Sequence, residues 1–508
     1  MKLCLYIIIL GFLLCCAIES YGQIYFPELK FQKFYGTSNK DKATALVLGI
    51  DSNLYISGVI QAEKKIDCTE GYLFKVNSEG NLIWSKTLGG SGCDEIRALT
   101  VSPDSTILFG GISGSSFKHP EYADSLETAD FLVGKIHLEG NLLWKKTIGG
   151  SYQDIGNGIT STPYGGAVLV GSTWSKDFDA SSTHHGANDT WLTIVSKSGE
   201  LIRELKFGGK KNDWANSITK TKDGGYILSG FTNSEELDQS LGRFNGDAWV
   251  SKLDFAGTKV WDRIFKESYE DQLFKVVENP YGFIYACGTS FEEGKGYQFW
   301  LVKLDALGNP LFNRKWGDTG HEILTSLYPT SDGGLILTGY SYFETLENPL
   351  IKGGYDCWVI RTDGFGDIIW QKTYGGPTYE KGIDVIEFKP HQFFVLAEKH
   401  NHFEKNGTVK DIDFWLLSIH EIDCEVVKPL FTMDIKNNFE KMDTPIRFQN
   451  LSNFGERYLW DFGDGTYSTE KNPIKSYRLP GFYYVTLTVF VNENCYKSYK
   501  YPSYITVM

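Results

Sequence analysis

The chain has 508 residues and a formal net charge of −13, with 15% aromatic residues and 54 glycines against 15 prolines. One hydrophobic core does not usually serve so long a chain, so we expect several domains or a repeat array. The composition is typical of β-rich, turn-rich proteins, and the acidic balance without an offsetting basic cluster argues against a nucleic-acid partner.

The N-terminus predicts a cleaved signal peptide at residues 1–22. Lys2 precedes an apolar run at residues 3–18, which is shorter than the roughly 20 residues that a membrane span needs. Ser20 and Gly22 are small residues that fit a cleavage site before Gln23. The alternative is an uncleaved anchor. We expect an exported protein, periplasmic, extracellular or at the cell surface, with no transmembrane segment in its mature chain.

A repeated pattern covers most of the sequence. Residues 142–150 read Leu-Leu-Trp-Lys-Lys-Thr-Ile-Gly-Gly, and close copies stand at residues 82–90 and 368–376. Each repeat has four strand-like segments, which we name a to d in chain order. Segment a follows the Gly-Gly, an Asp-Gly turn separates a from b in several copies, c is rich in Trp, and d is the Trp-Lys-Thr run.

The number of segments predicts how the repeats are arranged. Segment c occurs seven times, but segment d follows only the first six copies. The missing d stands at the other end, at residues 31–36, where Lys33 and Gly36 have the spacing of Lys372 and Gly375. We therefore predict an all-β chain with a seven-bladed β-propeller at residues 23–423. Its N-terminal strand pairs with residues 414–419 and closes the ring.

The repeats also resemble bacterial β-propeller repeats with the consensus D-x-W-L-V-K-L-D-x-x-G-N-x-x-W-x-K-T-Y-G-G, which often occur beside PKD domains. Residues 247–254 and 356–361 are good copies, whereas the fifth repeat has Gln298 in place of the leading Asp. The resemblance implies the propeller fold and says little about function.

After Cys424 the pattern changes. Residues 460–465 read Trp-Asp-Phe-Gly-Asp-Gly, and residues 484–489 alternate as a half-buried strand does. This part is similar to the PKD domain, so we predict an Ig-like β-sandwich at residues 424–508, with Trp460 and Phe462 in its core.

Six cysteines follow the signal peptide, and export permits disulfides. The c–d hairpin of the first repeat brings residue 68 opposite about residue 90, which predicts a bond between Cys68 and Cys93. Cys424 and Cys495 are the candidates for a bond in the sandwich. Cys287 and Cys357 lie in different repeats, and we expect them to be free and buried.

Two acidic positions recur. One precedes segment a (Asp94, Asp154, Asp213, Asp271, Glu380) and the other begins segment c (Asp130, Asp189, Asp247, Asp356, Asp413). A ring of carboxylates can bind Ca²⁺, but one acid per repeat fits better with side chains that accept hydrogen bonds from their own turn. The pair His184-His185 is a candidate for a metal site with His119, His400 or His402, although a pair in a polar loop is usually solvated.

The loops between b and c vary most in length, and all are predicted to lie on one face. Long loops on a rigid scaffold often carry binding sites. Their aromatic residues are our candidates for stacking on sugars or anchoring a protein, or alternatively for sealing the blades: Trp174, Phe178, Phe231, Phe244, Tyr342, Phe343 and Phe403. The c–d turns of the opposite face are expected to be short and polar.

The sequence contains no recognisable catalytic set and no cofactor motif. We therefore predict an exported, monomeric, non-catalytic binding or adhesion protein for an extracellular or cell-surface glycan or protein. The PKD domain is then a spacer or a secondary binding module. The alternative is a polysaccharide-active hydrolase or lyase on the same propeller.

Overall fold

The computed structural model describes residues 25–61, 68–90, 92–114, 129–183, 185–234, 246–268, 270–317, 320–343, 354–376, 378–403, 409–435, 438–491 and 495–508. The chain divides into two compact units. The larger unit is Leu29–His420, and the smaller is Glu421–Met508 together with the chain up to Glu28. We describe each unit by itself.

The described residues of the larger unit form seven four-stranded sheets, each open at both edges. Six consist of four consecutive strands, and successive strands pair antiparallel, as in β2–β5. These six are β2 (Lys42–Leu48), β3 (Leu54–Gln61), β4 (Thr69–Val76), β5 (Leu82–Thr87); β6 (Asp94–Ser102), β7 (Thr106–Ser113), β8 (Asp130–His137), β9 (Leu142–Ile148); β10 (Asp154–Ser161), β11 (Ala167–Thr173), β12 (Asp189–Val195), β13 (Leu201–Phe207); β14 (Asp213–Lys220), β15 (Tyr226–Thr232), β16 (Asp247–Leu253), β17 (Lys259–Phe265); β18 (Asp271–Glu278), β19 (Ile284–Glu292), β20 (Gly296–Leu304), β21 (Pro310–Trp316); β22 (Gly320–Pro329), β23 (Leu335–Phe343), β24 (Asp356–Thr362) and β25 (Ile368–Tyr374).

The remaining sheet joins the two ends of the repeat region. Its order is β1 (Tyr25–Tyr35), β28 (Val409–Asp423), β27 (Gln392–Phe403) and β26 (Glu380–Lys389). The indole of Trp415 donates to Oε1 of Gln32 at 3.0 Å, and the Phe34 ring stacks on Trp415 with centroids 6.1 Å apart. The N-terminal strand predicted for this sheet is therefore confirmed.

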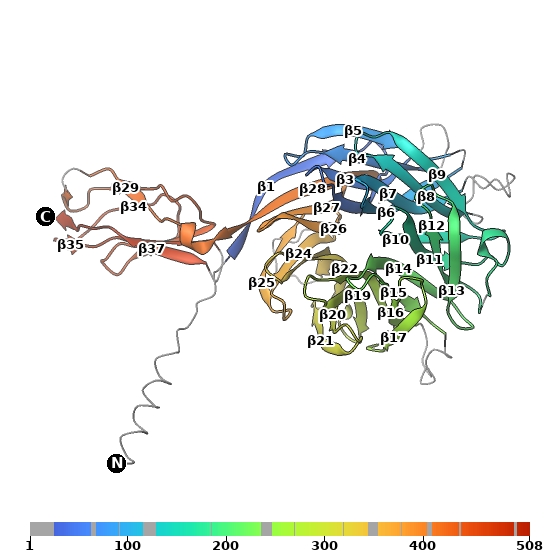
Figure 1. Cartoon of the computed structure of the whole chain (residues 1–508). Coiled ribbons are helices and arrows are strands. Elements are labelled where there is room, and N and C mark those ends of the chain that lie inside the picture. The colour runs from blue at the N-terminus through green and yellow to red at the C-terminus, as the bar shows by residue number, and fades with distance from the viewer. Residues whose placement is uncertain are drawn as a thin grey trace, which may run out of the picture. The chain divides into compact units, whose positions relative to one another are not determined.

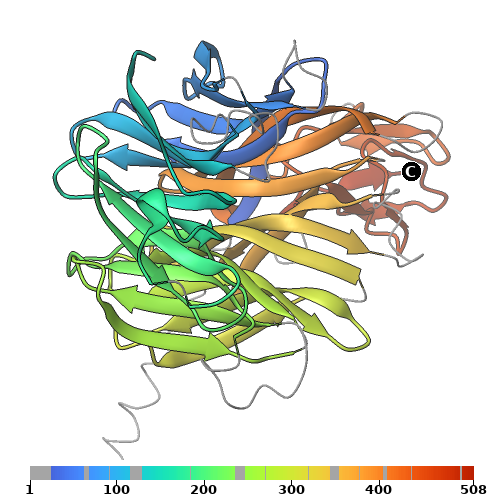
Figure 2. The ribbon, with the colours of Figure 1, turned by 90° about the vertical axis from the view of Figure 1, so that its right-hand side faces the viewer.

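Neighbouring sheets pack face to face through apolar side chains. The middle strands are the most deeply buried, and every residue of β16 and β24 is buried, whereas β5 at an outer edge has no buried residue. Trp358 and Ile360 pack in one cluster with Phe299 and Leu301 of the preceding sheet. Strands covered on both faces need near-continuous apolar residues, which explains the Trp-Leu-Val pattern of segment c. The sheets follow one another around a centre (Figure 1), and in the view turned by 90° their strands lie one above another (Figure 2).

The Trp of segment d contacts the next repeat. Its indole N–H donates to a carbonyl in the following c–d turn: Trp84 to Leu138 at 3.0 Å, Trp144 to Lys197 at 2.9 Å and Trp261 to Ala306 at 3.3 Å. The Gly of the same turn has a positive φ, and at Gly199 (φ +83) a Cβ would lie 2.6 Å from the Trp144 ring. The recurring Trp and Gly of the sequence are therefore two halves of one contact between repeats.

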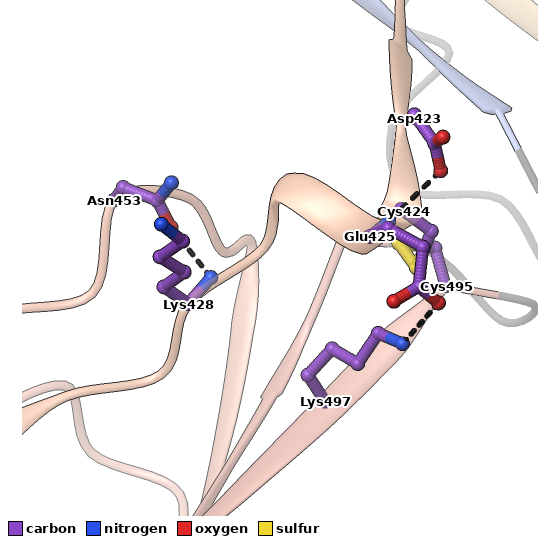
Figure 3. The surroundings of a disulfide bond; sticks show 7 residues. All are labelled: Asp423, Cys424, Glu425, Lys428, Asn453, Cys495 and Lys497. Atoms are coloured by element: carbon purple, nitrogen blue, oxygen red, sulfur yellow. Dashed lines mark hydrogen bonds and ion pairs between the residues drawn. A yellow bond between two sulfur atoms is a disulfide. The ribbon is translucent and has the colours of Figure 1, made fainter.

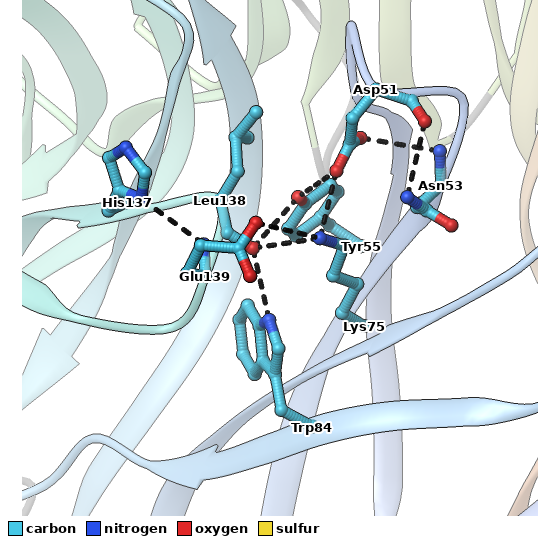
Figure 4. Close-up of polar contacts among 8 residues, drawn as sticks. All are labelled: Asp51, Asn53, Tyr55, Lys75, Trp84, His137, Leu138 and Glu139. Atoms are coloured by element: carbon cyan, nitrogen blue, oxygen red, sulfur yellow. Dashed lines mark hydrogen bonds and ion pairs between the residues drawn. The ribbon is translucent and has the colours of Figure 1, made fainter.

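Figure 4 shows the first of these contacts. The Leu138 carbonyl accepts from Nζ of Lys75 at 3.0 Å as well as from Trp84, and Lys75 also pairs with Asp51 at 2.9 Å. Burial raises the pKa of Asp51, but the hydrogen bonds from Lys75, Asn53 and Tyr55 outweigh it and lower that pKa. Segment c therefore carries a Lys because its ammonium binds the acidic turn between segments a and b.

The strand formed by segment a has a β-bulge at the same place in all seven sheets of the larger unit, namely in β2, β6, β10, β14, β18, β22 and β26. The residue skipped by the pairing often bonds to the next sheet. Thr44 donates to Ile96 O at 2.7 Å, Asn157 to Ala215 O at 3.0 Å, Asn216 to Leu273 O at 2.9 Å and Thr325 to Gly382 O at 2.9 Å. A bulge re-aims a side chain, and here it points toward the neighbouring sheet.

Residues of these seven strands line one central cavity of about 490 Å³. Lys275 of β18 pairs there with Asp384 of β26 at 3.1 Å, and Asp384 also accepts from Ser326 at 2.5 Å and from the amide of Leu46 at 2.9 Å. The first sheet and the sheet containing β1 share one apolar cluster, in which Leu54 and Phe74 pack with Phe394 and Phe414.

The smaller unit contains three sheets among its described residues. They are β29 (Phe431–Met433), β31 (Ile446–Asn450), β34 (Ile474–Lys475); β30 (Phe439–Glu440), β38 (Ile505–Val507), β35 (Gly481–Tyr483); and β33 (Tyr467–Ser468), β32 (Arg457–Asp461), β36 (Thr486–Phe490), β37 (Tyr496–Lys500). Trp460 and Phe462 are buried in its core, as predicted. The Tyr477 hydroxyl donates to Phe462 O at 3.0 Å. Short 3₁₀ turns are η3 (Phe178–Ala180) in the larger unit and η4 (Cys424–Val426) in the smaller.

One boundary differs from the sequence interpretation. Phe26 was expected in the repeat domain, but it is buried in the core of the smaller unit, with its ring 5.5 Å from that of Phe454. The sequence pattern of a strand does not reveal which core the strand joins, because an apolar residue satisfies either.

Both predicted disulfides are present, Cys68–Cys93 and Cys424–Cys495. Cys287 and Cys357 are free and buried, as expected. Figure 3 shows the second bond, beside which Lys497 pairs with Glu425 at 2.6 Å. This bond closes a separation of 71 residues and fixes the start of the smaller unit to its penultimate strand.

Candidate functional site

The recurring acids are part of the scaffold. Those before segment a are buried, and each accepts a hydrogen bond from an amide four residues earlier: Asp154 from Gly150 at 2.7 Å, Asp213 from Gly209 at 2.8 Å, Asp271 from Glu267 at 2.7 Å and Glu380 from Gly376 at 3.0 Å. Asp94 makes the same contact with Gly90. The interpretation of these acids as caps of their own turns is confirmed.

The acids that begin segment c lie beside them. Burial and the charge of Asp271 raise the pKa of Asp247 to about 6, and burial and Glu380 raise the pKa of Asp356 to about 6. In the fifth repeat, Gln298 takes this place and donates from Nε2 to Glu322 at 3.0 Å. An amide donor at this position mimics a protonated carboxyl group, which agrees with the raised pKa of its counterparts.

The predicted loop aromatics differ in exposure. Trp174 is 41% exposed and Phe178 is 61% exposed, on one short segment after β11. Phe231 is buried and stacks on Trp214 with centroids 4.2 Å apart, so it seals its sheet and is not available as a binding residue. Phe244 and the side chains of Phe343 and Phe403 lie outside the described residues.

The segment that carries Trp174 and Phe178 is held by buried polar groups. Nζ of Lys206 donates to Ala180 O at 2.6 Å, Ser175 O at 3.0 Å and Ser182 O at 3.2 Å. Burial lowers the pKa of Lys206, and nearby acids including Glu204 oppose this. Three carbonyls around one buried ammonium fix the path of the loop.

Two carboxylates complete this anchoring. Asp177 accepts from the amide and hydroxyl of Ser151 at 2.8 and 2.6 Å. Glu204 accepts from the amide and hydroxyl of Ser182 at 2.5 and 2.7 Å, and from the Trp191 indole at 2.9 Å. We do not regard these charged groups as ligand-binding residues, because each of them bonds to the loop and holds it in place.

Three exposed aromatic residues lie on this segment or beside it, Tyr152, Trp174 and Phe178, and we name them the aromatic platform. Tyr152 is 61% exposed, and its amide donates to Oγ of Ser175 at 2.9 Å, which places it beside the Trp174 segment. Phe178 has a φ of +52°, a conformation that costs a bulky residue about 1–2 kcal/mol. An exposed ring in a strained backbone is a feature that folding alone does not require.

Tyr342 belongs to a second group, which we name the tyrosine cluster: Tyr340, Tyr342, Tyr355, Tyr379, Lys381 and His400. Successive rings lie 5.2 Å (Tyr340–Tyr355), 5.4 Å (Tyr342–Tyr355), 5.8 Å (Tyr355–Tyr379) and 5.8 Å (Tyr379–His400) apart. The residues of the cluster come from β23, β26 and β27 and from the positions just before β24 and β26. They lie at the end of the sheets where the b–c loops begin. Sequence analysis found only Tyr342 of this group.

The proposed histidine site is not assembled in the described residues. His119 and His184 lie outside them, as does the side chain of His402, and His185 is exposed. His400 packs against Tyr379.

The opposite face departs from its prediction. The c–d turns are short, as expected, but three consecutive sheets present apolar residues there, with Phe255, Leu307 and Phe365 at least 70% exposed. The expectation of uniformly polar turns is therefore wrong, because only the Asp and Gly positions of these turns are constrained by hydrogen bonding, as at Asp254 and Asp305.

Residues 442–507 match the family model of the PKD domain. No curated protein sequence matches the chain. Solved structures that resemble it include Sqt1 from Chaetomium thermophilum, with 13% identity, a TM-score of 0.40, and coverage of 76% of this chain and 88% of that one. The Neurospora crassa Pan2 WD40 domain has 10% identity, a TM-score of 0.37 and coverage of 64% and 88%. The PQQ-bound aldose sugar dehydrogenase from Streptomyces coelicolor has 10% identity, a TM-score of 0.38 and coverage of 79% and 99%.

The described residues of the chain thus combine repeated four-stranded sheets with a C-terminal segment that matches the PKD domain. The structural similarities carry no inference about activity. None of the helices in the described residues is long and apolar enough to cross a membrane.

Proposed function

We propose that this chain is an exported binding protein whose aromatic platform, Tyr152, Trp174 and Phe178, holds a glycan. The observation that supports this most is the strained and exposed Phe178 in a loop fixed by Lys206, Asp177 and Glu204. Rings held in place before binding lose little conformational entropy when a ligand arrives, and planar aromatic faces suit the flat faces of sugar rings.

We infer further that the seven sheets are the blades of one closed ring. Two observations support a ring. One strand from each of the seven sheets of the larger unit lines a single cavity, and the first sheet shares its apolar cluster with the sheet containing β1. In such a ring the loops between second and third strands lie on one face, which would carry both the platform and the tyrosine cluster. The PKD domain serves as spacer or secondary binding module.

Export is part of the proposal and rests on two features. The sequence begins with a segment of signal-peptide type, and two disulfides form between cysteines of the remaining chain. Disulfides persist in oxidising compartments, and this supports a location outside the cytoplasm.

The test compares variants that remove the platform with a control on the other face. The double variant Trp174→Ala/Phe178→Ala should bind immobilised polysaccharides at least tenfold more weakly than the wild type, with a nearly unchanged Tm. Tyr164→Ala is the matched control, because Tyr164 is 88% exposed in a turn between first and second strands. A double variant that binds as the wild type does would refute the platform.

The same preparations decide between binding and catalysis. A binding protein leaves polysaccharides intact over a day of incubation. Release of reducing ends or unsaturated products by the wild type, at a rate proportional to enzyme, would replace this proposal with the hydrolase or lyase alternative.

A further inference from the structure

The tyrosine cluster surrounds a cation, Lys381, that forms no salt bridge with any residue the structure describes. Nζ of Lys381 lies 4.9 Å from the Tyr340 ring centroid and 5.5 Å from that of Tyr355. Among the described residues it forms no ion pair and no hydrogen bond. By contrast, four buried cations, Lys75, Lys135, Lys252 and Arg361, each pair with an Asp, and two others, Lys206 and Lys303, donate to backbone carbonyls. A half-buried ammonium between aromatic faces keeps its positive charge and can attract an anionic ligand.

Hydrogen-bond donors accompany this charge. The hydroxyls of Tyr340, Tyr342 and Tyr355 make no hydrogen bond to any residue that the structure describes, and all three side chains are half-buried. The ring nitrogens of His400 also lack a partner within the described part of the chain. The ring nitrogens of His400 are buried, and a folded protein usually satisfies buried polar atoms, so their lack of a partner beside a cation and three available hydroxyls suggests that a ligand binds here.

A nearby acid, Glu398, influences the charge around Lys381. Burial raises the pKa of Glu398 to about 7, which the ammonium of Lys381 opposes, and its Oε1 accepts the amide of Ala43 at 3.1 Å. Lys42 also acts on Glu398, while burial and Lys381 lower the pKa of His400 against the charge of Glu380. These are the charged groups that face Lys381 and His400 from β26, β27 and β2.

We propose that the tyrosine cluster is a binding site for an anionic sugar residue, with Lys381 facing its acidic group and the tyrosines its ring. The unpaired ammonium and the free hydroxyls can donate hydrogen bonds to an anionic group. The four rings offer faces on which a sugar ring can stack. An acidic peptide would use the ammonium but would not need four aromatic rings. The site goes beyond the platform of the proposed function, shares no residue with it, and can stand if the platform fails.

The direct test measures binding of three oligosaccharides and one peptide to the full chain. The probes are an oligogalacturonate, a sulfated chondroitin oligosaccharide, a neutral malto-oligosaccharide and oligoglutamate. We expect both acidic sugars, or the one whose acid group fits, to bind at least tenfold more tightly than the neutral sugar. Lys381→Gln should weaken that binding about tenfold, as expected for the loss of a charge-assisted contact.

The matched control lies on the same strand. Lys389, at the other end of β26, is exposed and contacts the Phe388 ring at 5.1 Å, so Lys389→Gln changes net charge equally without touching the cluster. Equal loss of binding in both variants would mean that net charge alone attracts the sugar, which would overturn the site. A preference for oligoglutamate over oligogalacturonate would overturn the sugar as ligand.

The pH dependence gives an independent readout. As the pH falls from 8 to 6, Glu398 gains a proton and leaves Lys381 without a competing carboxylate, so binding of the acidic sugar should tighten. Glu398→Gln keeps the acceptor for Ala43, and it should bind more tightly at pH 8 and lose this pH dependence. Binding by Glu398→Gln that weakens as in Lys381→Gln would contradict the arrangement. If the acidic sugar lost binding to Trp174→Ala/Phe178→Ala but not to Lys381→Gln, the platform would be supported as its binding site and the tyrosine cluster would be refuted.

Discussion

Replacing Asp247 with Asn tests the paired acids that recur in the repeats. Asp247 is 4% exposed, and its partner Asp271 accepts from the amides of Glu267 and Ser268 and from the Ser268 hydroxyl at 2.7–2.8 Å. Those three donors stabilise the charge on Asp271. Asp247 has no such donors, so it is the member of the pair that we expect to hold the proton.

The magnitude follows from the pKa of Asp247. Burial and the Asp271 charge raise that pKa from 3.8 to about 6. A raised folded-state pKa contributes stability that is fully present below pH 3.8 and is lost as the pH rises through 6. The difference corresponds to up to about 3 kcal/mol of unfolding free energy, at about 1.4 kcal/mol for each unit. Asn cannot ionise and can donate to Asp271 as Gln298 donates to Glu322.

Chemical unfolding at pH 4.5 and pH 8 measures the effect. Asp247→Asn should unfold with nearly wild-type free energy at pH 4.5 and should be more stable than the wild type at pH 8. Gln298→Glu is the reciprocal variant, which places a second acid beside Glu322 and should lose stability as the pH rises. A constant difference between Asp247→Asn and wild type at both pH values would refute the shared proton.

Three further predictions concern the scaffold. Deletion of residues 23–37 removes β1 and with it the Trp415 contacts, so the Tm should fall sharply, and an unchanged Tm would show that β1 is dispensable. Gly199→Ala puts a Cβ against Trp144 at positive φ and should lower unfolding free energy by about 1–3 kcal/mol, whereas Gly224→Ala, with open space at similar φ, should cost less. Peptide mapping without reduction should find Cys68 joined to Cys93, and alkylation of either would contradict this bond.

The repeat region could be predicted in detail because its residues are local and periodic. Each recurring residue type makes the same kind of contact in its repeat. This holds for the Gly-Asn turns, the leading acid of segment c and the Trp of segment d, as in the bond from Trp144 to Lys197. The offset of the missing segment d likewise predicted the neighbour of β28. Phe26 was assigned to the wrong unit because an apolar residue in the sequence shows that it will be buried but does not show in which core.

The candidate sites were predicted only in part, and the reason lies in how residues were selected. Loop length directed attention to Trp174, Phe178 and Tyr342, and it also selected Phe231, which is a core residue. Whether a loop aromatic is exposed depends on partners such as Lys206 and Trp214, which come from other segments of its repeat. That information is tertiary, and no window of sequence contains it.

A different use of the sequence would have found the tyrosine cluster, because the repeats act as an internal alignment. The residue before the acid of segment c is Ala129, Asn188 or Gly246 in earlier repeats, but Tyr297 and Tyr355 in the fifth and sixth. The residue before the acid of segment a is Gln153 or Asn212 in earlier repeats, but His321 and Tyr379 in the sixth and seventh. These rings meet in two pairs, with Tyr297 5.5 Å from His321 and Tyr355 5.8 Å from Tyr379. Apart from Gln298, the acids themselves obey the repeat, so the scaffold does not explain aromatic neighbours confined to three adjacent repeats. Selection for a ligand does explain them, and it follows that the positions where a repeat protein departs from its own consensus are where its binding site should be sought.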